Sequence, residues 1–107
     1  MTKKEVENSR MEGHNSIIYK IWLNHDENLL YSCSDDSTIK IWDLETFDEI
    51  EGLCMTVDIN ESVNDFYVSN DESLLISCQN HSTEPLYIIG YWNLDTGKNI
   101  NFQKIQN

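Results

Sequence analysis

Basic residues are scarce in this chain, which holds 7 Lys and Arg against 19 Asp and Glu, for a formal net charge of −12. Binding to a nucleic-acid backbone requires clustered Lys and Arg that replace the counterions around the phosphates. The composition therefore argues against direct nucleic-acid binding. An acidic surface favours solubility, and it is also compatible with a partner protein that presents a basic surface.

Cysteines and glycines are few, and long apolar runs are missing. The chain has an odd number of cysteines, Cys33, Cys54 and Cys78, and no C-x-x-C pair. This argues against a disulfide framework or a zinc site. Four glycines leave no Gly-rich phosphate loop. No apolar run approaches the roughly 18 residues of a membrane span, and residues 1–12 lack the apolar core of a signal peptide. We therefore expect a cytoplasmic or nuclear protein without a cofactor.

Short apolar runs alternate with polar turns through the first half of the chain. The runs Ile17–Leu23, Leu29–Cys33 and Thr38–Trp42 are rich in β-branched and aromatic residues, and residues 48–53 form a weaker fourth run. No long apolar stripe with helical spacing occurs. The pattern predicts an all-β fold, and 107 residues suffice for one small domain.

The chain also repeats itself. Leu29–Cys33 (LLYSC) recurs as Leu74–Cys78 (LLISC), and Trp42–Thr46 (WDLET) recurs as Trp92–Thr96 (WNLDT). A repeat of about 45 residues is typical of a propeller blade or a similar array, in which one unit cannot bury both of its faces alone. We therefore predict two copies of one four-stranded antiparallel unit.

The first copy carries Gly13-His14, then Ser32–Asp36, then Ile41-Trp42-Asp43, and with these residues it resembles the WD-repeat family. The resemblance implies a β-propeller that is incomplete as a single chain. The expected organisation is a polar N-terminal tail, or the end of a missing blade, at 1–12, a first blade at 13–58 and a second, degenerate blade at 59–107.

The second copy departs from the family pattern. It lacks the Gly-His pair, and the turn before its third strand, Gln79–Pro85, is five residues longer than the corresponding turn of the first copy. Pro85 and Gly90 suggest a displaced third strand, since proline cannot donate a hydrogen bond inside a sheet. We expect this blade to be less rigid there, with a loop free to serve function.

The resemblance further implies a hydrogen-bonded tetrad in each regular blade, here formed by His14, Ser32, Asp36 and Trp42. Its chemistry is reasonable, because each buried polar group needs a partner or costs about 1–3 kcal/mol. The small polar residues around Asp36 would then be structural. The second copy retains only Ser77 and Trp92 of this set, and His81 is an open candidate for the missing histidine.

Catalytic and metal-binding interpretations are weaker. Asp35 and Asp36 are adjacent and point in different directions, which suits a turn better than an acid–base pair. His14, His25 and His81 show no metal-ligand spacing. Cys33 and Cys78 occupy equivalent positions, where we expect small core residues. The sequence predicts a non-catalytic protein with no metal site.

The resemblance places partner binding at the loops that lead into each blade and at the turn between its second and third strands. The corresponding residues are Asn15, Ser16, Ile17 and Asp35 in the first copy and Glu61, Ser62, Asn80, His81 and Glu84 in the second. Packing against another blade is an equal alternative for Ile17. The expected partners are other proteins, including ones with basic surfaces.

Two blades do not close a propeller, which takes about four to eight. The chain can be a fragment of a larger propeller, can associate with copies of itself, or can complete another protein's propeller. The predicted function is a non-catalytic protein-interaction scaffold. A self-assembling, lectin-like propeller that binds a ligand between blades is the alternative, with Trp22, Tyr67 and Tyr91 as candidate cleft residues. An enzyme is the weakest hypothesis.

Overall fold

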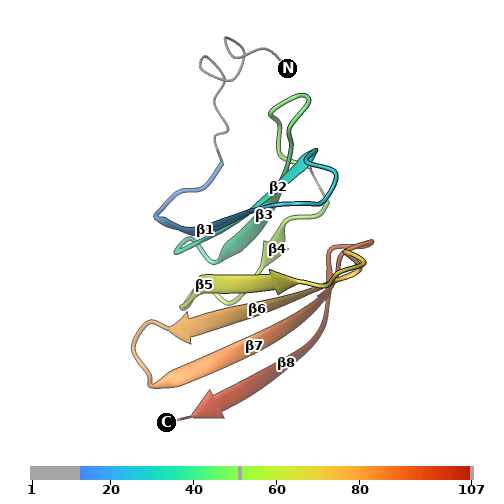
Figure 1. Ribbon diagram of the computed structural model, residues 1–107. Helices are drawn as coiled ribbons and strands as arrows, with labels where there is room; N and C mark the ends of the chain where they lie inside the picture. The colour runs from blue at the N-terminus through green and yellow to red at the C-terminus, as the bar shows by residue number, and fades with distance from the viewer. Residues whose placement is uncertain (1–12, 51, 107) are drawn as a thin grey trace.

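Two four-stranded antiparallel sheets make up the computed structural model, which describes residues 13–50 and 52–106 (Figure 1). The strands of the first sheet are β1 (Ile18–Leu23), β2 (Leu29–Ser34), β3 (Thr38–Asp43) and β4 (Met55–Thr56). Those of the second are β5 (Glu61–Val68), β6 (Leu74–His81), β7 (Leu86–Asn93) and β8 (Lys98–Gln106). The described residues form no helix, and therefore none that could cross a membrane. The all-β prediction is confirmed, whereas the expected tail at 1–12 lies outside the described residues.

The first three predicted runs of the first sheet are strands, but the fourth was placed wrongly. The described part of this run, residues 48–50 and 52–53, contributes an isolated bridge between Glu49 and Trp42 and no strand. The backbone then turns at Gly52, whose φ of 84° suits glycine. It returns as the two-residue strand β4, which pairs with Thr38 and Ile39 of β3. The apolar run at residues 48–53 therefore does not form the fourth strand. The turn at Gly52 interrupts pairing with β3, which resumes at β4.

The five additional residues of the second copy lengthen a hairpin more than they lengthen a turn. Strands β6 and β7 have 8 residues each, where β2 and β3 have 6 each. The turn grows only from residues 35–37 to residues 82–85. Asn80 pairs with Tyr87, so the ladder continues without interruption and the third strand is not displaced. Pro85 lies just before β7, where its missing N–H breaks no ladder bond.

The core lies between the two sheets, which pack face to face. The first sheet contributes buried Tyr31, Cys33 and Ile39, and the second contributes Phe66 and Leu75 among others. The rings of Tyr31 and Phe66 stack with centroids 6.3 Å apart. Fully burying an apolar side chain of this size stabilises the fold by about 1.5–3 kcal/mol. The shared cluster therefore makes the two sheets a single folding unit.

Within residues 13–50 and 52–106, large apolar side chains are exposed on the opposite, outer face of each sheet. Ile21 and Leu23 of β1 are 62% and 43% exposed, and Tyr67 of β5 is 60% exposed. Cys78 is also exposed, although its counterpart Cys33 is fully buried. The prediction that both cysteines are core residues is thus wrong for Cys78, because it lies on the outer face of the second sheet.

Candidate functional site

Four side chains of the first sheet form a continuous hydrogen-bonded chain, here called the first relay. The indole N–H of Trp42 donates to Ser32 Oγ (2.8 Å), and the Ser32 hydroxyl donates to His14 Nε2 (2.6 Å). His14 Nδ1–H then donates to Asp36 Oδ2 (2.9 Å). The His14 and Asp36 side chains are only 3% and 8% exposed. The structure therefore brings together the four residues that the family resemblance implied.

Asp36 ends the first relay and accepts further bonds. The Asn15 amide donates to Oδ2 (3.0 Å), while the Thr38 amide and hydroxyl donate to Oδ1 (3.1 and 2.5 Å). Burial alone would raise the pKa of Asp36, but the hydrogen bonds from Thr38, Asn15 and His14 outweigh burial and lower it. A carboxylate with so many donors is a poor proton acceptor. Its arrangement favours a structural role over catalysis.

The second sheet has a relay of its own with different residues, here called the second relay. The Trp92 indole donates to Ser77 Oγ (2.9 Å), and the Ser77 hydroxyl donates to Gln79 Oε1. Gln79 Nε2 then donates to Glu61 Oε1 (3.1 Å), so this relay also ends on a carboxylate. Gln79 is fully buried.

Sequence reasoning missed Gln79 and left its role open to His81. The structure instead places His81 at the end of β6, where its Nδ1 accepts from the amides of Thr83 and Glu84 (3.2 Å each). A signal for Gln79 was present, because it follows Ser77 by two residues and side chains two apart on a strand share a face. The second copy is degenerate in its residues but retains a complete relay.

A glycine packs closely against each tryptophan. A Cβ on Gly13 would lie 2.8 Å from Trp42 Cη2, and one on Gly90 would lie 2.5 Å from Ser77 Oγ and 2.7 Å from Trp92 Nε1. All three distances are shorter than real Cβ contacts. Gly90 therefore provides room for the second relay within an intact β7, rather than marking a displaced strand.

The residues predicted for partner binding gather at one end of the two sheets, seen at the left in Figure 1. We call residues 13–17, 35–37, 58–62 and 81–85 the loop end. Asp35 connects the sheets there, since it accepts from the hydroxyls of Ser16 (3.4 Å) and Ser62 (2.8 Å). Ile17 is 63% exposed.

Two of the predicted residues differ from expectation. Asn80 and His81 belong to β6, where they pair with Ser62 and Glu61 of β5, and both are half-buried. The expectation that they lie on a free loop is therefore wrong, because the hairpin extends to include them. Glu84 lies on the turn itself and is exposed.

The loop end is strongly acidic. Its sequence holds five carboxylates and no Lys or Arg; the carboxylates are Asp35, Asp36, Asp58, Glu61 and Glu84. Those of Asp35, Asp58 and Glu84 belong to exposed residues. Negative charges concentrated on one surface attract a cationic partner. No group of three or more His, Cys, Asp or Glu placed to hold a metal ion occurs in 13–50 and 52–106.

The three aromatic residues proposed for a ligand cleft do not line one site. Trp22 packs edge-on against Tyr31, with ring centroids 5.2 Å apart, on the side of the first sheet that faces the core. Tyr67 lies on the outer face of the second sheet. Tyr91 donates its hydroxyl to Gln103 Oε1 (2.8 Å).

Comparison with known proteins finds a family match over part of the chain. The model described as WD domain, G-beta repeat matches residues 6–43, which include all of the first relay. Over these residues the chain is similar to the WD-repeat family. Each four-stranded sheet corresponds to one propeller blade, and we name the sheets the first blade and the second blade.

Two curated relatives share part of the chain. WD40 repeat-containing protein smu1 of Dictyostelium discoideum is 41% identical over 44 residues, which cover 41% of this chain and 8% of that protein. Eukaryotic translation initiation factor 3 subunit I of Schizosaccharomyces pombe is 36% identical over 58 residues, which cover 49% of this chain and 18% of that protein. The match thus spans less than a fifth of either relative.

Solved structures agree in fold. The crystal structure of RRP9 WD40 repeats superimposes with a TM-score of 0.68 at 16% identity, over 91% of this chain and 28% of that chain. The structure of U3-55K gives the same values. At this identity the likeness shows the fold, with two blades of this chain matching about a quarter of a longer propeller chain.

Proposed function

We propose that this chain is a non-catalytic protein-interaction scaffold, formed by two WD-repeat blades of a larger propeller. Its loop end binds a basic surface of a partner protein. The observation that carries this proposal is the loop end, which holds five carboxylates and no Lys or Arg. Loops held by a rigid sheet scaffold are common sites of recognition. One similar protein is named as a subunit of an initiation factor, which supports a role within an assembly.

The loop end is organised before any partner binds. The first relay fixes residues 13–15 to the turn at Asp36, and Ser62 fixes the second blade to Asp35. The Ser37 hydroxyl adds a bond to the Glu61 carbonyl (2.5 Å). A preorganised surface loses less conformational entropy on binding, so its charges contribute more to affinity.

Binding of a synthetic lysine-rich peptide, followed by fluorescence anisotropy, tests the proposal. Replacing Asp58 by Asn and Glu84 by Gln together removes two exposed charges from the loop end. Because each such charge contributes about 0.2–1 kcal/mol, we expect affinity to fall about two- to thirtyfold. Affinity for the unaltered chain should also fall as salt rises, since salt screens exposed charges.

The matched control removes two charges from the opposite end of the first blade. Glu45→Gln combined with Asp48→Asn changes the net charge by the same amount, and both residues are exposed. We expect less than about a twofold change. Equal weakening by the two pairs would show that only the net charge matters, and the loop end would then have no role as a binding surface.

A further inference from the structure

The two blades share an interface whose residues have counterparts on the uncovered faces. In this interface the first blade presents Lys20 and Tyr31, and the second presents Phe66 and Leu75. The repeat relates Lys20 to Asp65, Tyr31 to Ile76, Ile21 to Phe66 and Leu30 to Leu75. Each blade therefore uses one face within the chain. Its other face corresponds to the interface face of the other blade, and no described residue covers it.

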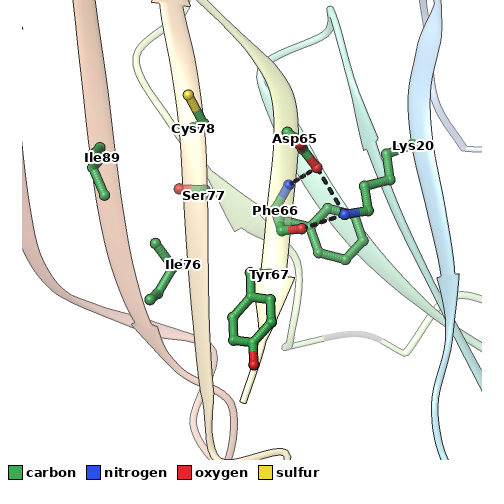
Figure 2. Close-up of a pocket in the computed structure, with 8 residues that line it drawn as sticks. All are labelled: Lys20, Asp65, Phe66, Tyr67, Ile76, Ser77, Cys78 and Ile89. Carbon is green, nitrogen blue, oxygen red and sulfur yellow. Dashed lines mark hydrogen bonds and ion pairs between the residues drawn. The ribbon is translucent and has the colours of Figure 1, made fainter. Parts of the chain in front are cut away.

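The outer face of the second blade contains a hollow of about 300 Å³. It is lined by Asp65, Tyr67, Ile76 and Cys78, with Lys20 at its edge (Figure 2). These positions correspond to those on the first blade that pack against Phe66 within the chain. The face thus repeats an existing docking surface, but nothing within the described residues fills it.

The outer face of the first blade has the complementary character. Ile21 and Leu23 occupy the positions that Phe66 and Val68 occupy in the second blade, and both are largely exposed. Leu30, which corresponds to buried Leu75, is only partly buried. This face therefore carries apolar side chains where the second blade carries those that enter the interface.

The charged residues of the two outer faces are also complementary. Lys20 Nζ donates to Asp65 Oδ1 (2.8 Å) and to the Phe66 carbonyl (2.6 Å). Lys20 and Asp65 are equivalent positions, so a copy stacked in the same way would place its Lys20 beside Asp65 of this chain. The Asp65 side chain is 64% exposed and can accept a second cation. Repeated stacking would alternate lysine and aspartate along the row of first strands.

We propose that the outer face of the second blade binds the outer face of the first blade in a second copy of this chain. The contact joins different surfaces head to tail, and such contacts form a ring when the rotation closes. Propellers close with about four to eight blades, which corresponds to about two to four copies. The inference rests on the blade architecture of the proposed function and is independent of the acidic loop end.

Light scattering on the 107-residue chain measures the assembly directly, with Ile76→Glu and Ile21→Lys as variants on the two open faces. We expect a discrete species of about two to four copies for the unaltered chain. Either variant alone should give the mass of one chain, with the β-sheet circular dichroism retained. An equal mixture of the two should reassemble into rings with an even number of copies, because the acidic side chain of Ile76→Glu would face the basic side chain of Ile21→Lys. The equivalent positions, Tyr31 and Phe66, stack within the chain.

Ile59→Glu is the matched control, since Ile59 is 89% exposed on the loop end and belongs to neither outer face. It should assemble like the unaltered chain. Measurement at about 0.15 M and about 1 M salt, where the Debye length is about 8 Å and 3 Å, should show stronger assembly at high salt because the net charge of −12 is screened.

A single-chain mass for the unaltered protein at both salt concentrations overturns the proposal, and blades of another protein would then be the better candidates for these faces. An oligomer or aggregate whose mass neither variant reduces also overturns it. Peptide binding at the loop end is measured separately, so failure of the assembly and failure of the proposed function can be distinguished.

Discussion

At the scale of single residues, Asp36 is a nearly buried carboxylate that depends on several hydrogen-bond donors. Its carboxylate accepts hydrogen bonds from His14, Asn15 and both donors of Thr38, in a place where the side chain is nearly inaccessible to water. Charged acceptors form stronger hydrogen bonds than neutral ones. The charge of Asp36 therefore stabilises the first blade.

Asp36→Asn should lower the unfolding free energy by about 1–3 kcal/mol near neutral pH, because an amide places donors against donors. The pKa of Asp36 in the folded chain lies below its ordinary value of 3.8, so its contribution is present above that value and is lost as pH falls through the lowered pKa. The difference in unfolding free energy between the unaltered chain and the variant should therefore be smaller in acid. Urea unfolding followed by tryptophan fluorescence, at about pH 7 and about pH 3, measures it.

Asp35→Asn is the control, because Asp35 is exposed and its loss should cost less than about 1 kcal/mol. Two outcomes would contradict a structural role for the Asp36 charge. The first is an equal loss of unfolding free energy in the two variants, and the second is a loss in Asp36→Asn that does not change with pH.

The sequence predicted the first relay because its four residues follow a family spacing. It did not predict the second relay, since Gln79 meets Glu61 only after β5 and β6 align with Glu61 opposite His81. That alignment depends on a bulge between Val63 and Asp65, and the local sequence gives no signal for this bulge.

At the scale of elements, the β6–β7 hairpin decides how the second blade accommodates its altered sequence. Its strands are longer than those of the first blade, and Gly90 at the centre of β7 lies against the second relay. The sequence predicted strands in the first blade well, because short runs of β-branched residues bounded by turns are specific signals. It failed for β4, whose position depends on the turn at Gly52 rather than on apolar content.

Gly90→Ala should destabilise the chain by about 1–3 kcal/mol, because the new methyl group would displace Ser77 or Trp92 and break the second relay. Thermal unfolding by circular dichroism measures the loss. Cys78→Ala, on the opposite face of β6, should change the unfolding free energy by no more than about 0.5 kcal/mol. A Gly90→Ala variant as stable as the unaltered chain would show that the second relay contributes nothing to folding.

At the scale of the whole molecule, the two blades depend on one core. Tyr31 of the first and Phe66 of the second stack directly, and Lys20 adds a polar contact between the blades. The sequence indicated that one blade could not bury both its faces, but not which side chains would meet, because this depends on how the sheets stack. The outer faces of the two blades are exposed for the same reason, because two blades bury only the faces between them.

Phe66→Ala should lower the unfolding free energy by about 3–5 kcal/mol and weaken both blades together. Hydrogen exchange of backbone amides checks this, since β3 and β7 should lose protection by similar factors. Ile100→Ala, at an exposed position on β8, should leave exchange in both strands nearly unchanged. Loss of protection in β7 alone would show that the blades fold independently.

The length of the β6–β7 hairpin has a consequence for how such repeats diverge. Its five additional residues divide into two on each strand and one in the turn. Residues directly opposite each other in an antiparallel ladder share a face, so adding the same number to each arm preserves the facing of every pair beyond the insertion. Trp92 thus still points toward Ser77 after the insertion. Hairpins of this kind can gain equal lengths on both arms without inverting their interior, whereas an unmatched gain of one residue on one arm would turn the tryptophan outward.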